Sequence, residues 1–257
     1  DMNYEFVNDH FNGECLYPKI ITAQGFPEFD KRNYSCSQHS IKNGLRVTRY
    51  QPSDFTNTVH FFGGSTAFGH GSVDAETIPS FLQNRINLDP NLVAFRVVNH
   101  GVSAVVVAQQ LLLLKRIELS PNDIVIFYDG GNDMYQSVIY GNPEGTIIGY
   151  NAQNRFYIAL IPLKFWLSRN SNIYAALSRL KRAWKGDVNP GQQLCLDEEV
   201  LKQRTAAGSD HYLSVIRKAY QHAVSTEASF LHFFQPVLVS GEQRNRTPYE
   251  RGLMKKP

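Results

Sequence analysis

The residue of this chain best suited to chemistry by its type and position is Ser65. It follows residues 59–62, which have β-strand character, in the run Gly63-Gly-Ser-Thr66. A strand that ends in this run would place a hydroxyl at the carboxyl edge of a sheet, where open α/β sheets bind their ligands. The two glycines would let the backbone turn sharply and let a substrate come close to a nucleophile. The same run also suits a plain strand-to-helix turn in which Ser65 caps the helix.

Two later strand-like segments end in comparable ways. Residues 94–98 lead into Asn-His-Gly, which ends at Gly101, and residues 123–128 lead into Gly-Gly-Asn-Asp, which contains Asn132. Three successive strands would therefore deliver a serine, a glycine and an asparagine to one sheet edge. In this order and context the motifs resemble those of the SGNH (GDSL-like) hydrolases, well over about residues 59–135 and loosely over 228–250.

The resemblance implies a fold and a set of roles. The fold is α/β, a flavodoxin-like parallel sheet sandwiched by helices in three layers. Ser65 would be the nucleophile that attacks an acyl carbonyl. The backbone amides of Ser65 and Gly101 and the side-chain amide of Asn132 would form the oxyanion hole, which stabilises the charge that develops on the carbonyl oxygen.

No histidine in this sequence matches the motif that carries the general base in such hydrolases. The family carries it in an Asp-x-x-His motif, and none of the eight histidines has an aspartate three positions earlier. We expect the final strand and the base loop to lie beyond Pro257, outside this chain; a natural pseudoenzyme is the other explanation. His70 and His100 stand near the expected edge but are poorly placed, because His70 follows Ser65 closely and His100 precedes Gly101.

The alternation of segments predicts how these residues are positioned. Strand and helix patterns alternate from Val59 to Tyr128, which is typical of a parallel sheet with helices on both faces. A helix from about His211 to Thr226 and a strand at 229–236 follow. We predict a loop-rich extension over 1–57, with one short strand near 45–50. A hydrolase domain would span 58–257, with a helical insertion at about 140–210.

The composition of the 257-residue chain excludes several classes of protein. A net charge of +3 is too small to indicate nucleic-acid binding, and no nucleotide, cofactor or metal motif is present, so we expect no cofactor and no metal. Cys15 and Cys36 are either bridged or two small thiols. No apolar stretch is long enough to span a membrane. Because the chain begins at Asp1, we expect a processed piece of a periplasmic, secreted or membrane-anchored protein.

A basic segment at 164–185 suggests a partner. It interleaves aromatic residues with six cations and contains no acidic residue, the cations being Lys164, Arg169, Arg179, Lys181, Arg182 and Lys185. Such a segment is suited to an anionic glycan or a membrane surface. A solvated helix face is the simpler interpretation.

We therefore predict a serine ester hydrolase that acts on an O-acyl ester, in particular an O-acetyl group on a surface or extracellular glycan. An O-acyltransferase would use the same serine and differ only in the acceptor of the acyl group. A non-catalytic glycan-binding or polysaccharide-assembly protein is the alternative from another class, because no base is visible.

Overall fold

The computed structural model describes residues 20–23, 26–29, 33–92, 94–143 and 197–235. All of these except 197–200 belong to one compact unit of the chain. The basic segment at 164–185 and most of the expected insertion at 140–210 lie outside the described residues.

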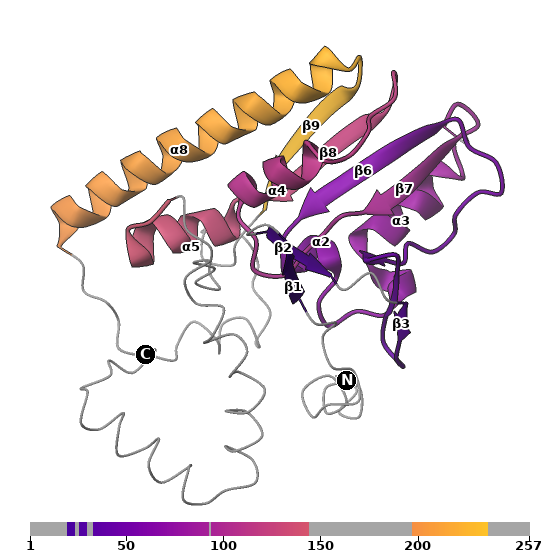
Figure 1. Cartoon of the computed structure of the whole chain (residues 1–257), viewed down its shortest axis with the longest axis horizontal. Coiled ribbons are helices and arrows are strands. Elements are labelled where there is room, and N and C mark those ends of the chain that lie inside the picture. The colour runs from indigo at the N-terminus through magenta and orange to yellow at the C-terminus, as the bar shows by residue number, and fades with distance from the viewer. Residues whose placement is uncertain (1–19, 24–25, 30–32, 93, 144–196, 236–257) are drawn as a thin grey trace, which may run out of the picture. The chain divides into compact units, whose positions relative to one another are not determined.

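The unit is built on a seven-stranded sheet with the order β3-β4-β5-β7-β6-β8-β9 (Figure 1). Its parallel part consists of β6 (Asn57–Gly63), β7 (Phe95–Asn99), β8 (Ile124–Asp129) and β9 (Ser229–Phe234). Here β6 pairs with both β7 and β8, and β9 pairs with β8. Numbered along the chain, these four strands have the order 2-1-3-4, which is the beginning of the flavodoxin-like arrangement. The predicted α/β class with a parallel core is confirmed.

Helices cover both faces of this sheet and complete three layers. One face packs against α4 (Val107–Leu114) and α8 (Glu198–Ser225), and the other against α2 (Ser65–Phe68) and α3 (Ile78–Ile86). Because side chains alternate along a strand, Phe62 joins the first core and Phe61 joins the second. A short 3₁₀ helix, η1 (Asp74–Glu76), precedes α3, and α5 (Gly131–Tyr140) follows β8.

The N-terminal extension contains more strand than the sequence predicted. Three short strands, β3 (Tyr34–Ser35), β4 (Ser40–Lys42) and β5 (Leu45–Arg46), continue the sheet beyond β7 in antiparallel fashion. Asn43 and Gly44, both with positive φ, turn β4 into β5; Asn-Gly is the pair that such a hairpin turn favours. A separate hairpin joins β1 (Ile20–Ala23) to β2 (Phe26–Phe29).

The return helix α8 begins at Glu198 rather than near His211, so this predicted boundary was wrong. The first turns of α8 are mostly exposed, and their charged and small residues show no apolar stripe that would indicate a helix. Within the described ranges no helix has both the length and the apolarity that a membrane crossing requires.

Candidate active site

Ser65 lies at the tight turn between β6 and α2. β6 ends at Gly63, and α2 begins at Ser65 itself. A Cβ atom on Gly63 would lie 2.4 Å from the Tyr128 carbonyl oxygen and 2.5 Å from the Ala67 Cβ, so only glycine fits there. The turn is therefore held against β8. Ser65 has the first N–H group of a helix, and such groups lack a partner within the helix.

Asn132 lies beside this turn, at the second position of α5. Its side-chain Nδ2 donates a hydrogen bond to the Val105 carbonyl oxygen at 2.8 Å. A Cβ on Gly64 would lie only 2.7 Å from the same Nδ2. The Asn132 amide thus lies against the residue that directly precedes Ser65. The structure brings together these two predicted site residues, which come from the ends of adjacent strands.

The backbone amide of Gly101 has a different partner from the one that its predicted role in the oxyanion hole requires. Its N–H donates to Asn99 Oδ1 at 2.8 Å, and both residues are buried. Asn99 Nδ2 in turn donates to the Ala67 carbonyl oxygen at 3.0 Å. A Cβ on Gly101 would lie 2.3 Å from the Phe68 nitrogen, so glycine is needed here for packing against α2. The amide of Gly101 is occupied within the fold, and we correct its assignment to the oxyanion hole.

The loop that follows Gly101 supplies a different backbone amide. Ala104 adopts a left-handed conformation with φ of 62°, which is uncommon for a residue with a Cβ atom. Its N–H meets no hydrogen-bond acceptor among the described residues. The next residue, Val105, is the one whose carbonyl oxygen accepts from Asn132. An alanine in a loop carries no sequence signal for this conformation, which is why the sequence pointed to the glycine instead.

Gln235 is a further polar residue at this edge that the sequence analysis did not select. Its Nε2 donates to Thr66 Oγ1 at 2.8 Å, next to the candidate nucleophile. Its backbone N–H donates to the Asp129 carbonyl oxygen, which anchors the segment directly after β9. The position of Gln235 in the sequence could have indicated it, because a polar side chain immediately after the fourth parallel strand lies at the ligand-binding edge of the sheet.

A small cavity of about 240 Å³ opens beside Ser65. Ser65, Thr66, His70 and Glu76 are among the residues that line it. His70 is exposed, and its backbone N–H donates to the Ser65 carbonyl oxygen at 2.9 Å. His70 therefore shares a cavity with Ser65, which makes it better placed than its close sequence spacing suggested.

His100 lies on the other side of β6 and is not bonded to Ser65. Its Nε2 is 3.0 Å from His60 Nδ1, and its ring stacks on Phe62 at 4.7 Å between centroids. Its Nδ1 is buried without a hydrogen-bond partner among the described residues. Burial, together with the neighbouring His60, lowers the pKa of His100 to about 3. This neutral histidine in the core is not suited to act as the general base for Ser65.

Two buried carboxylates lie at the end of β8, Asp129 as its last residue and Asp133 in the first turn of α5. Asp133 Oδ1 accepts from the Val107 N–H at 2.9 Å, where α4 begins. Burial, and secondarily the charge of Asp129, raises the pKa of Asp133 to about 7. The Tyr212 hydroxyl donates to Asp129 and lies 2.6 Å from His232 Nε2. In the described ranges no three acidic, histidine or cysteine side chains gather in a way that could hold a metal ion.

Comparison with known proteins yields similarity at the level of structure. No protein-family model matches the chain, and no curated protein matches it. Among solved structures it is similar to AlinE4, an SGNH-hydrolase family esterase, with 17% identity over 78% of this chain and 90% of that chain and a TM-score of 0.33. It is also similar to a variant of Axe2, an acetyl xylan esterase from Geobacillus stearothermophilus. That match has 16% identity over 69% of this chain and 76% of that chain, with a TM-score of 0.30. The first of these proteins belongs to the family that the three sequence motifs resemble.

Proposed function

We propose that this protein is a serine esterase that cleaves O-acyl esters, with Ser65 as its nucleophile. The observation that carries the proposal is the close approach of the Asn132 amide to Gly64, directly before Ser65, where an added Cβ atom would lie 2.7 Å from Asn132 Nδ2. A neutral amide donor next to a hydroxyl at the carboxyl edge of a parallel sheet is the arrangement that acyl transfer requires.

In this mechanism the Ser65 Oγ attacks the acyl carbonyl carbon and forms a tetrahedral intermediate. The carbonyl oxygen then carries negative charge and needs preorganised hydrogen-bond donors. We assign this role to the Ser65 N–H, the Asn132 Nδ2 and the Ala104 N–H, which replaces the amide of Gly101. The intermediate collapses when the alcohol leaves, and water then releases the acyl group from Ser65.

A base must take the proton from Ser65, and histidine serves most often in this role. His70 shares a cavity with Ser65, so it is the first described residue to test as the base. Among the described residues, however, no hydrogen bond links the Ser65 side chain to a histidine. This observation favours the second candidate function, a non-catalytic glycan-binding or assembly protein with the same fold.

For the substrate we propose an acetyl ester on an extracellular or surface glycan. Cys36 forms a disulfide whose partner cysteine lies outside the described residues, and disulfides persist mainly in oxidising compartments outside the cytosol. The acceptor of the acyl group would be water in a hydrolase or a sugar hydroxyl in an O-acyltransferase. An anionic partner for the 164–185 segment stays a prediction.

The test is hydrolysis of an aryl acetate together with labelling by a fluorophosphonate, which reacts with activated serines. Ser65→Ala should abolish both turnover and labelling, and mass spectrometry should find the label on the peptide that contains Ser65. Ser72→Ala is a matched control, since Ser72 lines the same cavity, and it should keep most of the activity. If the wild-type protein is inactive and unlabelled, the result would favour the alternative function, a non-catalytic glycan-binding or assembly protein. Activity that survives Ser65→Ala would refute Ser65 as the nucleophile.

A further inference from the structure

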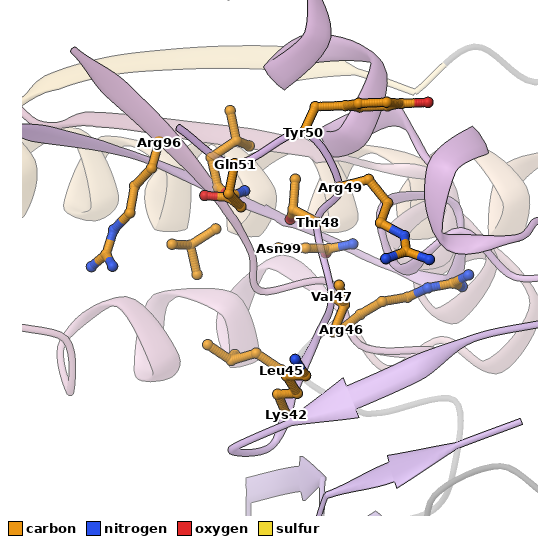
Figure 2. Close-up of a pocket in the computed structure, with 12 residues that line it drawn as sticks. Lys42, Leu45, Arg46, Val47, Thr48, Arg49, Tyr50, Gln51, Arg96 and Asn99 are labelled. Atoms are coloured by element: carbon orange, nitrogen blue, oxygen red, sulfur yellow. The ribbon is translucent and has the colours of Figure 1, made fainter. Parts of the chain in front are cut away.

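A second hollow lies on the unit, between the segment around β5 and the parallel strand β7. It has a volume of about 420 Å³, within the range of small-ligand sites. Apolar side chains such as Leu45 and Val47 form part of its lining, and polar side chains form the rest (Figure 2). We call it the β5–β7 groove.

All the charged residues that line the groove are positively charged. Lys42, Arg49 and Arg96 line it, and none of the described lining residues is acidic. These three cations form no ion pair with a described residue. In Figure 2 Arg96 lies on one side and Arg49 on the other, with Thr48 and Asn99 between them. A groove of this kind attracts an anion, since a low-dielectric cleft with charges of one sign concentrates their field.

The fourth cation of the groove, Arg46, has a structural role. It is buried, and its guanidinium donates to Asp74 and to the carbonyl oxygens of Phe68, Gly69 and Ser72. Arg46 thereby joins β5 to the turn after α2. Of the remaining three cations, Lys42 and Arg49 are exposed. Arg96 is half-buried, with its guanidinium carbon 4.0 Å from the centroid of the Phe55 ring and its Nε donating to Thr58 Oγ1 at 3.2 Å.

The groove also contains a polar atom that lacks a partner. Thr48 is 7% exposed, and its Oγ1 is buried without a hydrogen bond to any described group. Leaving a buried hydroxyl unsatisfied typically costs about 1–3 kcal/mol, so such a group calls for an explanation. A ligand hydroxyl or carboxylate in the groove would supply the missing partner.

Tyr50 adds an aromatic surface whose backbone is held in place. Its φ is 63°, a strained value for a bulky residue, and Asn87 Nδ2 donates to its carbonyl oxygen at 2.8 Å. The Tyr50 side chain is about half exposed at the groove. Strained residues that the surrounding structure holds in place cluster at binding sites.

From these observations we infer that the β5–β7 groove binds an acidic sugar unit of a glycan chain. The cations would pair with the oxyanion of a carboxylate or sulfate, the Thr48 hydroxyl would bond a sugar oxygen, and Tyr50 would present its ring to the sugar. Charge-assisted hydrogen bonds of arginine to such oxyanions are stronger than those between neutral groups.

This inference rests on the proposed function and specifies its substrate class. Asn99 lines the groove and also bonds the Gly101 N–H and the Ala67 carbonyl oxygen, beside the turn that carries Ser65. A glycan chain bound in the groove would thus be held near the esterase site. The substrate would be an O-acylated glycan that contains acidic sugars.

The experiment measures binding of a trisaccharide of galacturonic acid to the full chain by titration calorimetry. The matching trisaccharide of galactose, which carries neutral hydroxymethyl groups in place of the carboxylates, is the control ligand. We expect the acidic ligand to bind at least tenfold more tightly, and this preference should shrink as salt rises, because exposed charges are screened over about 10 Å at 0.1 M. A galactose oligosaccharide that carries sulfates distinguishes a general oxyanion site from one selective for carboxylates.

Two variants locate the site. Lys42→Gln/Arg49→Gln should weaken binding by roughly tenfold or more. Arg217→Gln/Lys218→Gln removes the same charge from exposed positions of α8 and should leave binding unchanged. Thr48→Val keeps the shape of the side chain, so it should weaken binding severalfold while leaving the melting temperature unchanged or higher.

Equal affinity for the two trisaccharides, or no binding of any acidic sugar, would overturn the inference. So would equal losses in the two charge variants, or a single-stranded oligonucleotide that binds more tightly through Lys42 and Arg49. These measurements involve no catalysis. Acidic sugar binding without esterase activity would therefore refute the proposed function alone, and esterase activity without this binding would refute only the groove.

Discussion

The turns after β6 and β7 both contain a glycine whose missing side chain lets another group come close, but the two glycines have different roles. At Gly64 the group that comes close is the side-chain amide of Asn132. At Gly101 it is the backbone of Phe68, and the Gly101 amide is bonded to Asn99. A glycine at a strand end thus indicates a close approach, and the approaching group decides whether the position serves chemistry or packing.

Replacing the asparagines that approach these two glycines, Asn132 beside Gly64 and Asn99 beside Gly101, should therefore have different effects. Asn132→Ala deletes a proposed oxyanion donor, which typically costs about 2.7–4 kcal/mol of barrier, so kcat should fall roughly a hundredfold or more. Stability should fall by only about 1 kcal/mol, because a single hydrogen bond, to the Val105 carbonyl oxygen, is lost. Asn99→Ala removes two buried hydrogen bonds and should instead lower the free energy of unfolding by about 2–3 kcal/mol.

Steady-state kinetics and thermal unfolding of both variants check this contrast. Full activity in Asn132→Ala would remove that residue from the site. A stable Asn99→Ala protein that loses only activity would show that the Asn99–Gly101 turn takes part in catalysis and would restore the Gly101 amide as an oxyanion donor.

A methyl group added at either glycine sharpens the same comparison. Gly101→Ala places a Cβ against backbone atoms that cannot rotate away, so we expect a loss of about 2–3 kcal/mol in stability. In Gly64→Ala the Asn132 side chain can rotate away, so stability should fall by about 1 kcal/mol or less while activity falls clearly. Denaturant unfolding, paired with an ester assay, separates the two outcomes; equal stability losses would show that the turns do not differ in this way.

Asp133 predicts a pH effect next to Asn132. The pKa of a free aspartate is 3.8, and burial raises that of Asp133 to about 7. Between these values the unfolded chain releases this proton and the folded protein retains it, so this group makes stability fall as pH rises through that window. Asp133→Asn does not titrate and keeps the oxygen that accepts from Val107.

The variant should therefore gain stability relative to the wild type by about 1 kcal/mol or more between about pH 5 and pH 8. Urea unfolding at several pH values measures this difference. A difference that is constant with pH would show that Asp133 has an ordinary pKa in the folded protein.

The smallest expected effect concerns Ala104. Glycine tolerates a left-handed backbone that strains alanine, so Ala104→Gly should stabilise the protein by about 1 kcal/mol or less. Because the proposed donor is the backbone N–H, activity should be retained. A large loss of activity in a stable Ala104→Gly protein would argue against a preformed amide at this position.

How much of this could be predicted from the sequence depends on the kind of signal. Strand-like runs that end in Gly-Gly-Ser and Gly-Gly-Asn indicated the parallel core and the proximity of Ser65 to Asn132, because hydrophobic runs and glycines can be recognised directly in the sequence. The partner of the Gly101 amide is a tertiary contact that no local pattern contains. The conformation of Ala104 and the early start of α8 were missed because neither has an apolar period or a turn residue to mark it.

The hydrogen bond between Gln235 and Thr66 joins residues 169 positions apart. Contacts of such long sequence separation form late in folding, since closing the intervening loop costs entropy before the contact can repay it. On the ribosome, Ser65 and Asn132 would be synthesised well before β9 could dock and bring Gln235 to their edge. The surroundings of Ser65 therefore gain Gln235 only after β9 has been synthesised, so a nascent chain would hold Ser65 and Asn132 without this neighbour while the intervening residues are made.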